Sequence, residues 1–178
     1  HETGHQVAHL TGWNAELGDA LAEVLAPRSR ELAEVWRGWA SEGAGDVHAF
    51  AQTGWAPLPA LANVVDGTTA EVYRMIAGDP HPVPWIRVML NAALCRSWFG
   101  AGPWDDLAAA WAHRHPPDNA PSDVGPLARL SVAALDDIVQ VCTRRPMVAF
   151  RGQPLHAVAD PSRVSPAALD ALARRAGP

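Results

Sequence analysis

Apolar residues recur along most of the chain at the spacing of three and four that is typical of amphipathic helices. In the N-terminal half, this spacing predicts helices over residues 1–12, 13–26, 29–53, 57–65 and 69–76. In the C-terminal half, it predicts helices over 85–99, 104–113 and 127–142, and a last helix that begins at Ser165-Pro166. Alternation with a period of two is scarce, and only residues 147–150 are predicted to form a short strand. The pattern therefore predicts a mainly α-helical protein.

Proline-rich segments divide the chain. Residues 115–126 are predicted to form a linker or surface loop between a core, residues 1–114, and a C-terminal helical extension, residues 127–178. A second such segment, residues 79–84, reads Asp-Pro-His-Pro-Val-Pro. It cannot be helical throughout, because proline lacks an N–H group and biases the residue before it toward extended geometry. We expect a stiff loop that leads into the helix beginning at Trp85.

Composition narrows the class of protein. Hydrophobic residues make up 48% of the 178 positions, which is enough to bury one substantial core. The formal net charge of −5 argues against a nucleic-acid partner, because such proteins present basic surfaces. No apolar stretch approaches the roughly 20 residues that span a bilayer, so a cytoplasmic location is favoured for this piece. Because the chain begins at His1 inside a motif that belongs within a helix, we expect upstream residues, and a targeting or membrane segment there remains open.

The first five residues, His1-Glu2-Thr3-Gly4-His5, spell H-E-x-x-H. On a helix, this spacing puts two imidazoles on one face, one turn apart, with a carboxylate beside them. His1 and His5 are therefore candidate zinc ligands, and Glu2 is the candidate base that takes a proton from a water activated by Zn²⁺. The motif also arises by chance, in which case the histidines are only polar residues on an exposed helix face. A third ligand has to decide between these interpretations.

Two sources of a third ligand can be set aside. Metzincins carry H-E-x-x-H-x-x-G-x-x-H, but here Ala8 stands at the glycine position and Thr11 at that of the last histidine. His9 lies one turn beyond His5 on the same helix. Three successive histidines of one helix cannot converge on a tetrahedral ion without severe bending. The third ligand is therefore expected from another helix.

Glu42 is the best candidate for that ligand, because a helical hairpin would bring it back beside the first helix. Asp46 follows one turn later and is expected to orient His1, since a metal-bound histidine usually donates its other ring nitrogen to an acid. The alternative is a solvated helix face. Apolar neighbours such as Val47 and Phe50 make that alternative less favourable.

His81 and Arg87 form a third element. His81 stands between two prolines, so its imidazole would be held in place to hydrogen-bond the oxyanion of a tetrahedral intermediate. Arg87 would reach the same region, where it could pair with Asp46 or steady His81. The alternative interpretation of His81 is a turn histidine without a role.

Together, H-E-x-x-H, E-x-x-x-D on a later helix and H-P-x-x-x-x-R resemble the CAAX prenyl protease and HtpX family of gluzincin zinc metallopeptidases. The resemblance covers roughly residues 1–87. It implies a helical zincin core, cut off upstream of its active-site helix, that hydrolyses peptide or protein substrates with Zn²⁺. The residue roles that it implies are zinc binding by His1, His5 and Glu42, activation of water by Glu2, support of a ligand by Asp46, and assistance to the transition state by His81 and Arg87.

One departure and two alternatives accompany this resemblance. The family pattern usually has alanine before the aspartate, whereas Gly45 precedes Asp46 here. The first alternative is a metal-binding or interaction domain that no longer cleaves, although a purely structural site has no use for a base at Glu2. The second is an inactive fragment, because gluzincins normally present a substrate-binding edge strand from sequence before the active-site helix. No such strand is visible in this chain.

Overall fold

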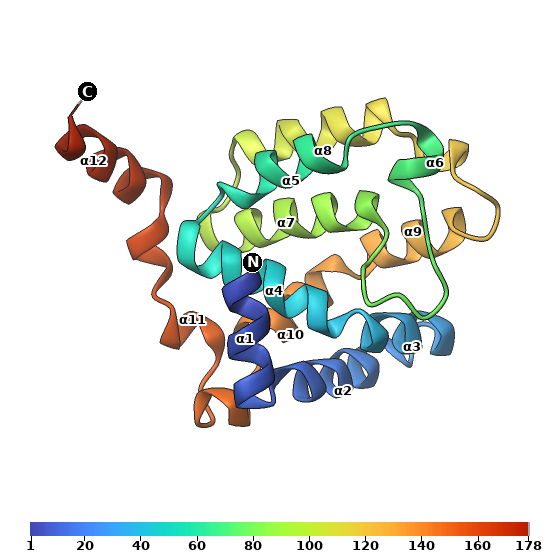
Figure 1. Ribbon diagram of the computed structural model, residues 1–178, viewed down its shortest axis with the longest axis horizontal. Coiled ribbons are helices and arrows are strands. Elements are labelled where there is room, and N and C mark those ends of the chain that lie inside the picture. The colour runs from blue at the N-terminus through green and yellow to red at the C-terminus, as the bar shows by residue number, and fades with distance from the viewer. Residues whose placement is uncertain (178) are drawn as a thin grey trace.

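The protein is mainly helical, as predicted. The computed structural model describes residues 1–177 (Figure 1). Pro178, the last residue of the predicted C-terminal extension, lies outside this range. Within it there is no strand, only an isolated antiparallel bridge between Met147 and Gln153. None of the described helices combines the length and apolar character that crossing a bilayer requires.

Eight α-helices precede the proline-rich segment at 115–126. Their bounds are α1 Glu2–Thr11, α2 Trp13–Leu25, α3 Arg30–Gly38, α4 Ala40–Thr53, α5 Pro57–Val65, α6 Thr69–Val72, α7 Pro84–Phe99 and α8 Pro103–Arg114. The remaining elements are the 3₁₀ helices η1 Pro117–Asn119, η2 Val148–Phe150 and η3 Pro161–Val164, and the α-helices α9 Gly125–Ala133, α10 Leu135–Arg144, α11 Leu155–Val158 and α12 Pro166–Ala176.

The long helix predicted over residues 29–53 is wrong, because the chain breaks at Trp39 into α3 and α4. The Trp39 side chain is buried and packs edge-on against Trp36, with ring centroids 5.7 Å apart. The break sends the two segments to different partners, since α3 packs along α2 while α4 packs along α1. It is therefore the break that puts the acidic part of α4 beside the H-E-x-x-H helix.

Three further predictions were wrong in detail. The helix expected over 127–142 is interrupted at Ala134 and forms α9 and α10. Residues 148–150 form η2 instead of a strand. The helix expected over 69–76 ends at Val72, because Tyr73 turns into the core and its hydroxyl donates a 2.7 Å hydrogen bond to the carbonyl of His115. Tertiary anchoring of Tyr73 thus overrides the local helical pattern.

Helix α7 lies at the centre of the structure and contacts α4, α5, α8, α9 and α10 (Figure 1). Helix α10 packs against both α2 and α7, so helices from the two halves of the chain share one core. A buried hydrogen bond of 3.1 Å from the indole nitrogen of Trp36 to the hydroxyl of Ser131 also joins α3 to α9. By contrast, α12 has no buried residue and lies at the periphery.

We predict that Ser131→Ala lowers the free energy of unfolding by about 1–3 kcal/mol, because it leaves the buried Trp36 N–H without an acceptor. Urea denaturation followed by circular dichroism measures this loss. In a Trp36→Phe background, the same serine substitution should be nearly neutral, because the donor is gone. Equal losses in both backgrounds would show that the hydrogen bond does not stabilise the fold.

Candidate metal centre

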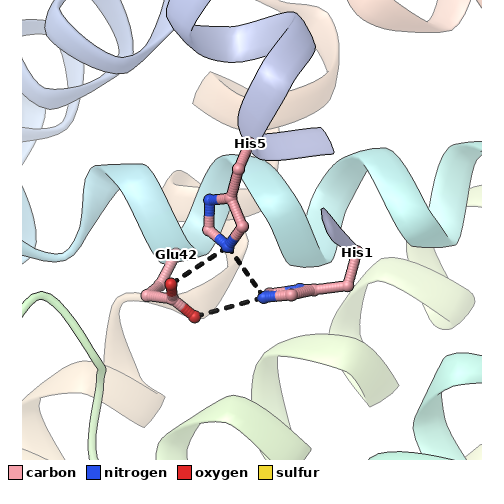
Figure 2. A group of neighbouring side chains, drawn as sticks. All are labelled: His1, His5 and Glu42. Carbon is pink, nitrogen blue, oxygen red and sulfur yellow. Dashed lines mark hydrogen bonds and ion pairs between the residues drawn. The ribbon is translucent and has the colours of Figure 1, made fainter. Parts of the chain in front are cut away.

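The structure brings His1, His5 and Glu42 together where α1 crosses α4 (Figure 2). The Nε2 atoms of the two histidines lie 2.9 Å apart. The two carboxylate oxygens of Glu42 lie 3.3 Å from Nε2 of His1 and 3.1 Å from Nε2 of His5. Three potential ligand atoms from two helices therefore point at one place.

The spacing of these atoms fits a single zinc ion. Two ligands about 2.05 Å from one ion at a tetrahedral angle lie about 3.3 Å apart, and the observed separations are 2.9, 3.1 and 3.3 Å. Two histidines and one glutamate also form a known donor set of catalytic zinc sites, in which water takes the fourth position. The residues present therefore fit Zn²⁺ in both chemistry and distance.

Two glycines allow α1 and α4 to approach this closely. A Cβ added at Gly4 would lie 3.0 Å from the Cα of Gly45. A Cβ added at Gly45 would lie 2.9 Å from Cε1 of His1 and 3.1 Å from Cε1 of His5. Both imidazoles thus rest on the bare backbone of Gly45. The sequence alone marked this glycine only as a departure from the family pattern, because a contact between distant segments leaves no local signal.

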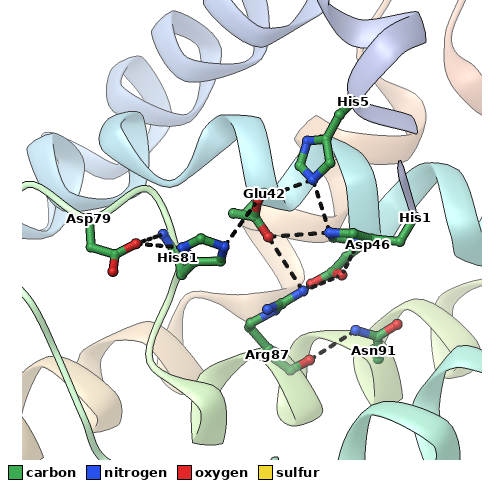
Figure 3. A network of polar contacts seen from close by, with 8 residues as sticks. All are labelled: His1, His5, Glu42, Asp46, Asp79, His81, Arg87 and Asn91. Atoms are coloured by element: carbon green, nitrogen blue, oxygen red, sulfur yellow. Dashed lines mark hydrogen bonds and ion pairs between the residues drawn. The ribbon is translucent and has the colours of Figure 1, made fainter. Parts of the chain in front are cut away.

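Asp46 holds His1 from behind (Figure 3). One of its carboxylate oxygens lies 2.9 Å from Nδ1 of His1. With a proton on Nδ1, the ring donates to Asp46, and its Nε2 is free to face His5 and Glu42. This is the orientation that the sequence analysis expected Asp46 to impose.

Arg87 pairs with Asp46, which is one of the two arrangements that the sequence left open (Figure 3). Its Nε and Nη2 donate to the two carboxylate oxygens of Asp46 at 2.9 and 2.8 Å. Such a bidentate pair fixes the carboxylate in position as well as offsetting its charge. Nη2 also lies 3.6 Å from Glu42. Arg87 thus contacts both buried acids of α4.

These contacts set the charge of the buried groups. Burial alone would raise the pKa of Asp46, but the hydrogen bonds from His1 and Arg87 outweigh it and hold that pKa below its ordinary value. The hydrogen bond to Asp46 in turn raises the pKa of His1, against the lowering effect of burial. Two buried carboxylates, Glu42 and Asp46, therefore face one guanidinium. The remaining negative charge favours a proton on a histidine or a bound cation.

His81 lies on the loop before α7 and faces the candidate ligands, on the side of Glu42 (Figure 3). Its Nε2 is 3.5 Å from the Glu42 carboxylate. On the other side of the ring, a carboxylate oxygen of Asp79 accepts hydrogen bonds from Nδ1 and from the backbone N–H of His81, the latter at 2.9 Å. Asp79 thus fixes the ring, a contact that the sequence analysis did not assign. The short Asp-x-His spacing is the signal that could have revealed it.

An open hollow of about 500 Å³ adjoins the group. Glu2 and His81 line it together with the three candidate ligands, whereas Arg87 does not. His9 also lines it but stands outside the group of ligand atoms, which all lie within 4.8 Å of one another. The hollow is thus lined by the candidate base, the candidate oxyanion donor and the candidate metal ligands.

Comparison with known proteins adds no relative: no protein-family model, no curated protein and no solved structure matches this chain. Any assignment of function has to rest on the residues and distances described above.

Proposed function

We propose that this protein is a zinc-dependent endopeptidase of the gluzincin type. The observation that carries the proposal is the convergence of the His1, His5 and Glu42 ligand atoms at separations that suit Zn²⁺. The presence of Glu2 on the wall of the same hollow supports catalysis over a purely structural metal site. The resemblance to the CAAX prenyl protease and HtpX motifs points in the same direction.

Zn²⁺ at this position would lower the pKa of water to about 7 and polarise a peptide carbonyl. Glu2 then accepts the proton of the attacking water and transfers it to the leaving amine. No covalent bond to the protein forms. His81 donates a hydrogen bond from Nε2 to the oxyanion when its ring is protonated, since Nδ1 is engaged with Asp79.

Arg87 and Asp46 act through the ligands. Arg87 is held by Asp46 and does not line the hollow, so we assign it the positioning of Asp46 and Glu42. Asp46 in turn orients His1. The chain of contacts Arg87–Asp46–His1 would keep the imidazole from rotating as substrate enters.

The rival function is a metal-binding domain that does not cleave. One observation favours it: no strand occurs among residues 1–177 to pair with an extended substrate. Metal content and peptide cleavage therefore have to be measured separately, because only cleavage distinguishes the peptidase from this rival.

We expect the purified protein to bind roughly one Zn²⁺ per chain, because a site of this ligand set holds a single ion. Glu42→Ala should lose stoichiometric zinc, since it removes the only carboxylate ligand, while Glu2→Gln should keep it. Elemental analysis after dialysis measures the metal. A wild-type chain that folds but binds no zinc would rule out both the peptidase and its non-catalytic rival.

We expect Glu2→Gln to lower the rate of peptide cleavage by about 10²–10⁴-fold, because the amide cannot accept the proton of the attacking water. Cleavage of unfolded casein, followed by mass spectrometry, gives the rate. Glu31→Gln is the control, since this exposed glutamate of α3 lies away from the hollow. Zinc binding without any Glu2-dependent cleavage would favour the non-catalytic domain.

We expect Gly45→Ala to weaken zinc binding by about 10–100-fold, as loss of a residue that orients metal ligands typically does. The added methyl group would push against the rings of His1 and His5. Gly43→Ala is the matched control, because a Cβ there meets no atom within 4 Å. It should leave affinity unchanged and raise helix stability by up to about 1 kcal/mol. Competition with a chromophoric chelator measures the zinc affinities of the two variants. Equal affinities would show that Gly45 does not shape the zinc site.

A further inference from the structure

A second hollow lies among α7, α8, α9 and α10, where α7 contacts each of the other three helices (Figure 1). Its volume is about 620 Å³, and sites for small molecules typically measure roughly 300–1,000 Å³. No residue lines both this α7–α10 hollow and the hollow at the candidate metal centre. The two hollows are therefore separate potential binding sites.

Much of the lining of the α7–α10 hollow is apolar, and all four helices contribute to it. Ala92, Leu135 and Val139 are buried residues of the core that reach this lining. The other apolar side chains that line it are Met89, Ala93, Ala108 and Val132. Such a surface favours a ligand with apolar side chains, because packing them together removes both surfaces from water.

Two acids and two arginines also line the α7–α10 hollow, and they differ in their partners. Arg96 and Asp105 pair with each other, and Nε of the arginine donates to the carboxylate at 2.8 Å. Asp136 and Arg144 are exposed and form no ion pair or side-chain hydrogen bond within residues 1–177. The hollow therefore offers one anion and one cation that an incoming molecule can reach.

The spacing of these two charges matches the ends of a short peptide. Asp136, Gln140 and Arg144 follow one another at intervals of four residues along α10. At a rise of 1.5 Å per residue, the Cα atoms of Asp136 and Arg144 lie about 12 Å apart. An extended tripeptide measures about 10 Å from its ammonium to its carboxylate. Between the two charges, the exposed amide of Gln140 can both donate and accept hydrogen bonds.

We propose that the α7–α10 hollow binds short zwitterionic peptides with apolar side chains. Asp136 accepts hydrogen bonds from the N-terminal ammonium, Arg144 donates to the C-terminal carboxylate, and Gln140 contacts the backbone between them. The first and third side chains of an extended tripeptide face the same way, so both can pack on the apolar lining. The proposal goes beyond the peptidase function and does not rest on it, because none of the candidate metal ligands lines this hollow.

Titration with the tripeptide Leu-Ala-Leu, followed by nuclear magnetic resonance, tests the proposal. The isotope-labelled protein carries Glu2→Gln, so that no cleavage competes with binding. We expect the backbone amide signals of α7 and α10 around the hollow to shift, and those of α1 to stay in place. Asp136→Asn and Arg144→Gln, each added to this protein, should weaken binding by about 3–10-fold, as loss of one charged contact does.

Two matched controls remove the same charges elsewhere. Asp123→Asn changes an exposed acid in the proline-rich segment, and Arg175→Gln changes an exposed arginine of α12. Neither residue lines the α7–α10 hollow. Both variants should bind Leu-Ala-Leu with unchanged affinity.

Capped peptides identify which residue holds which end. Acetylation of the N-terminus should weaken binding to the Glu2→Gln protein by about 3–10-fold and have little further effect once Asp136 is asparagine. Amidation of the C-terminus should show the same relation to Arg144→Gln. The peptide Gly-Gly-Gly should bind more weakly than Leu-Ala-Leu, because it has no apolar side chains to bury. Thermal melting shows that each variant is folded.

The outcomes separate this proposal from the peptidase function. Capping penalties that disappear only in the matching variant support the proposal, whether or not the wild-type chain cleaves casein. No shift at millimolar peptide, shifts confined to α1 and α4, or capping penalties that are the same in every variant overturn it. None of these three results would count against the peptidase, which zinc content and casein cleavage test.

Discussion

Two carboxylates lie buried one turn apart on α4, and much of the surrounding structure serves to compensate their charge. Glu42 is 6% exposed and Asp46 is 5% exposed. An unpaired buried charge is strongly destabilising, so partners have to come from other helices. Helix α7 supplies Arg87, and the N-terminal end of the chain supplies His1, which caps α1, and His5 within α1. Of these partners, only Arg87 carries a fixed positive charge. The second negative charge is left for a proton on a histidine or a bound cation to neutralise. The same imbalance makes the site attractive to a divalent metal.

The approach of α1 to α4 depends on small residues as much as on charge. Imidazole rings reach the buried acids only because Gly4 and Gly45 let the two backbones come together. The glycines alone do not specify a metal site. Combined with acids on α4 and histidines at a four-residue spacing on α1, they turn an ordinary helix crossing into a cluster of converging ligands. Packing and chemistry are therefore specified by the same few positions.

Hydrogen bonds to neighbouring acids support the candidate ligand His1 and the nearby His81. Asp46, held by its bidentate pair with Arg87, orients His1. Asp79, two positions before His81 in the sequence, accepts the hydrogen bonds that hold His81. In the proposed peptidase, such support would keep the reacting groups in place before substrate arrives, which is what electrostatic stabilisation of a transition state requires.

The sequence by itself determined the helical class of the fold, the spacing of His1 and His5, and the pairing of Asp46 with its arginine as one of two options. These features follow from periodicity within one helix or from the chemistry of side chains, both of which are local. Only the tertiary structure decided that the segment 29–53 breaks at Trp39, that Tyr73 ends α6, and that Gly45 seats the two imidazoles. Each of these depends on burial or contact between segments far apart in the chain, and no local pattern records such contacts.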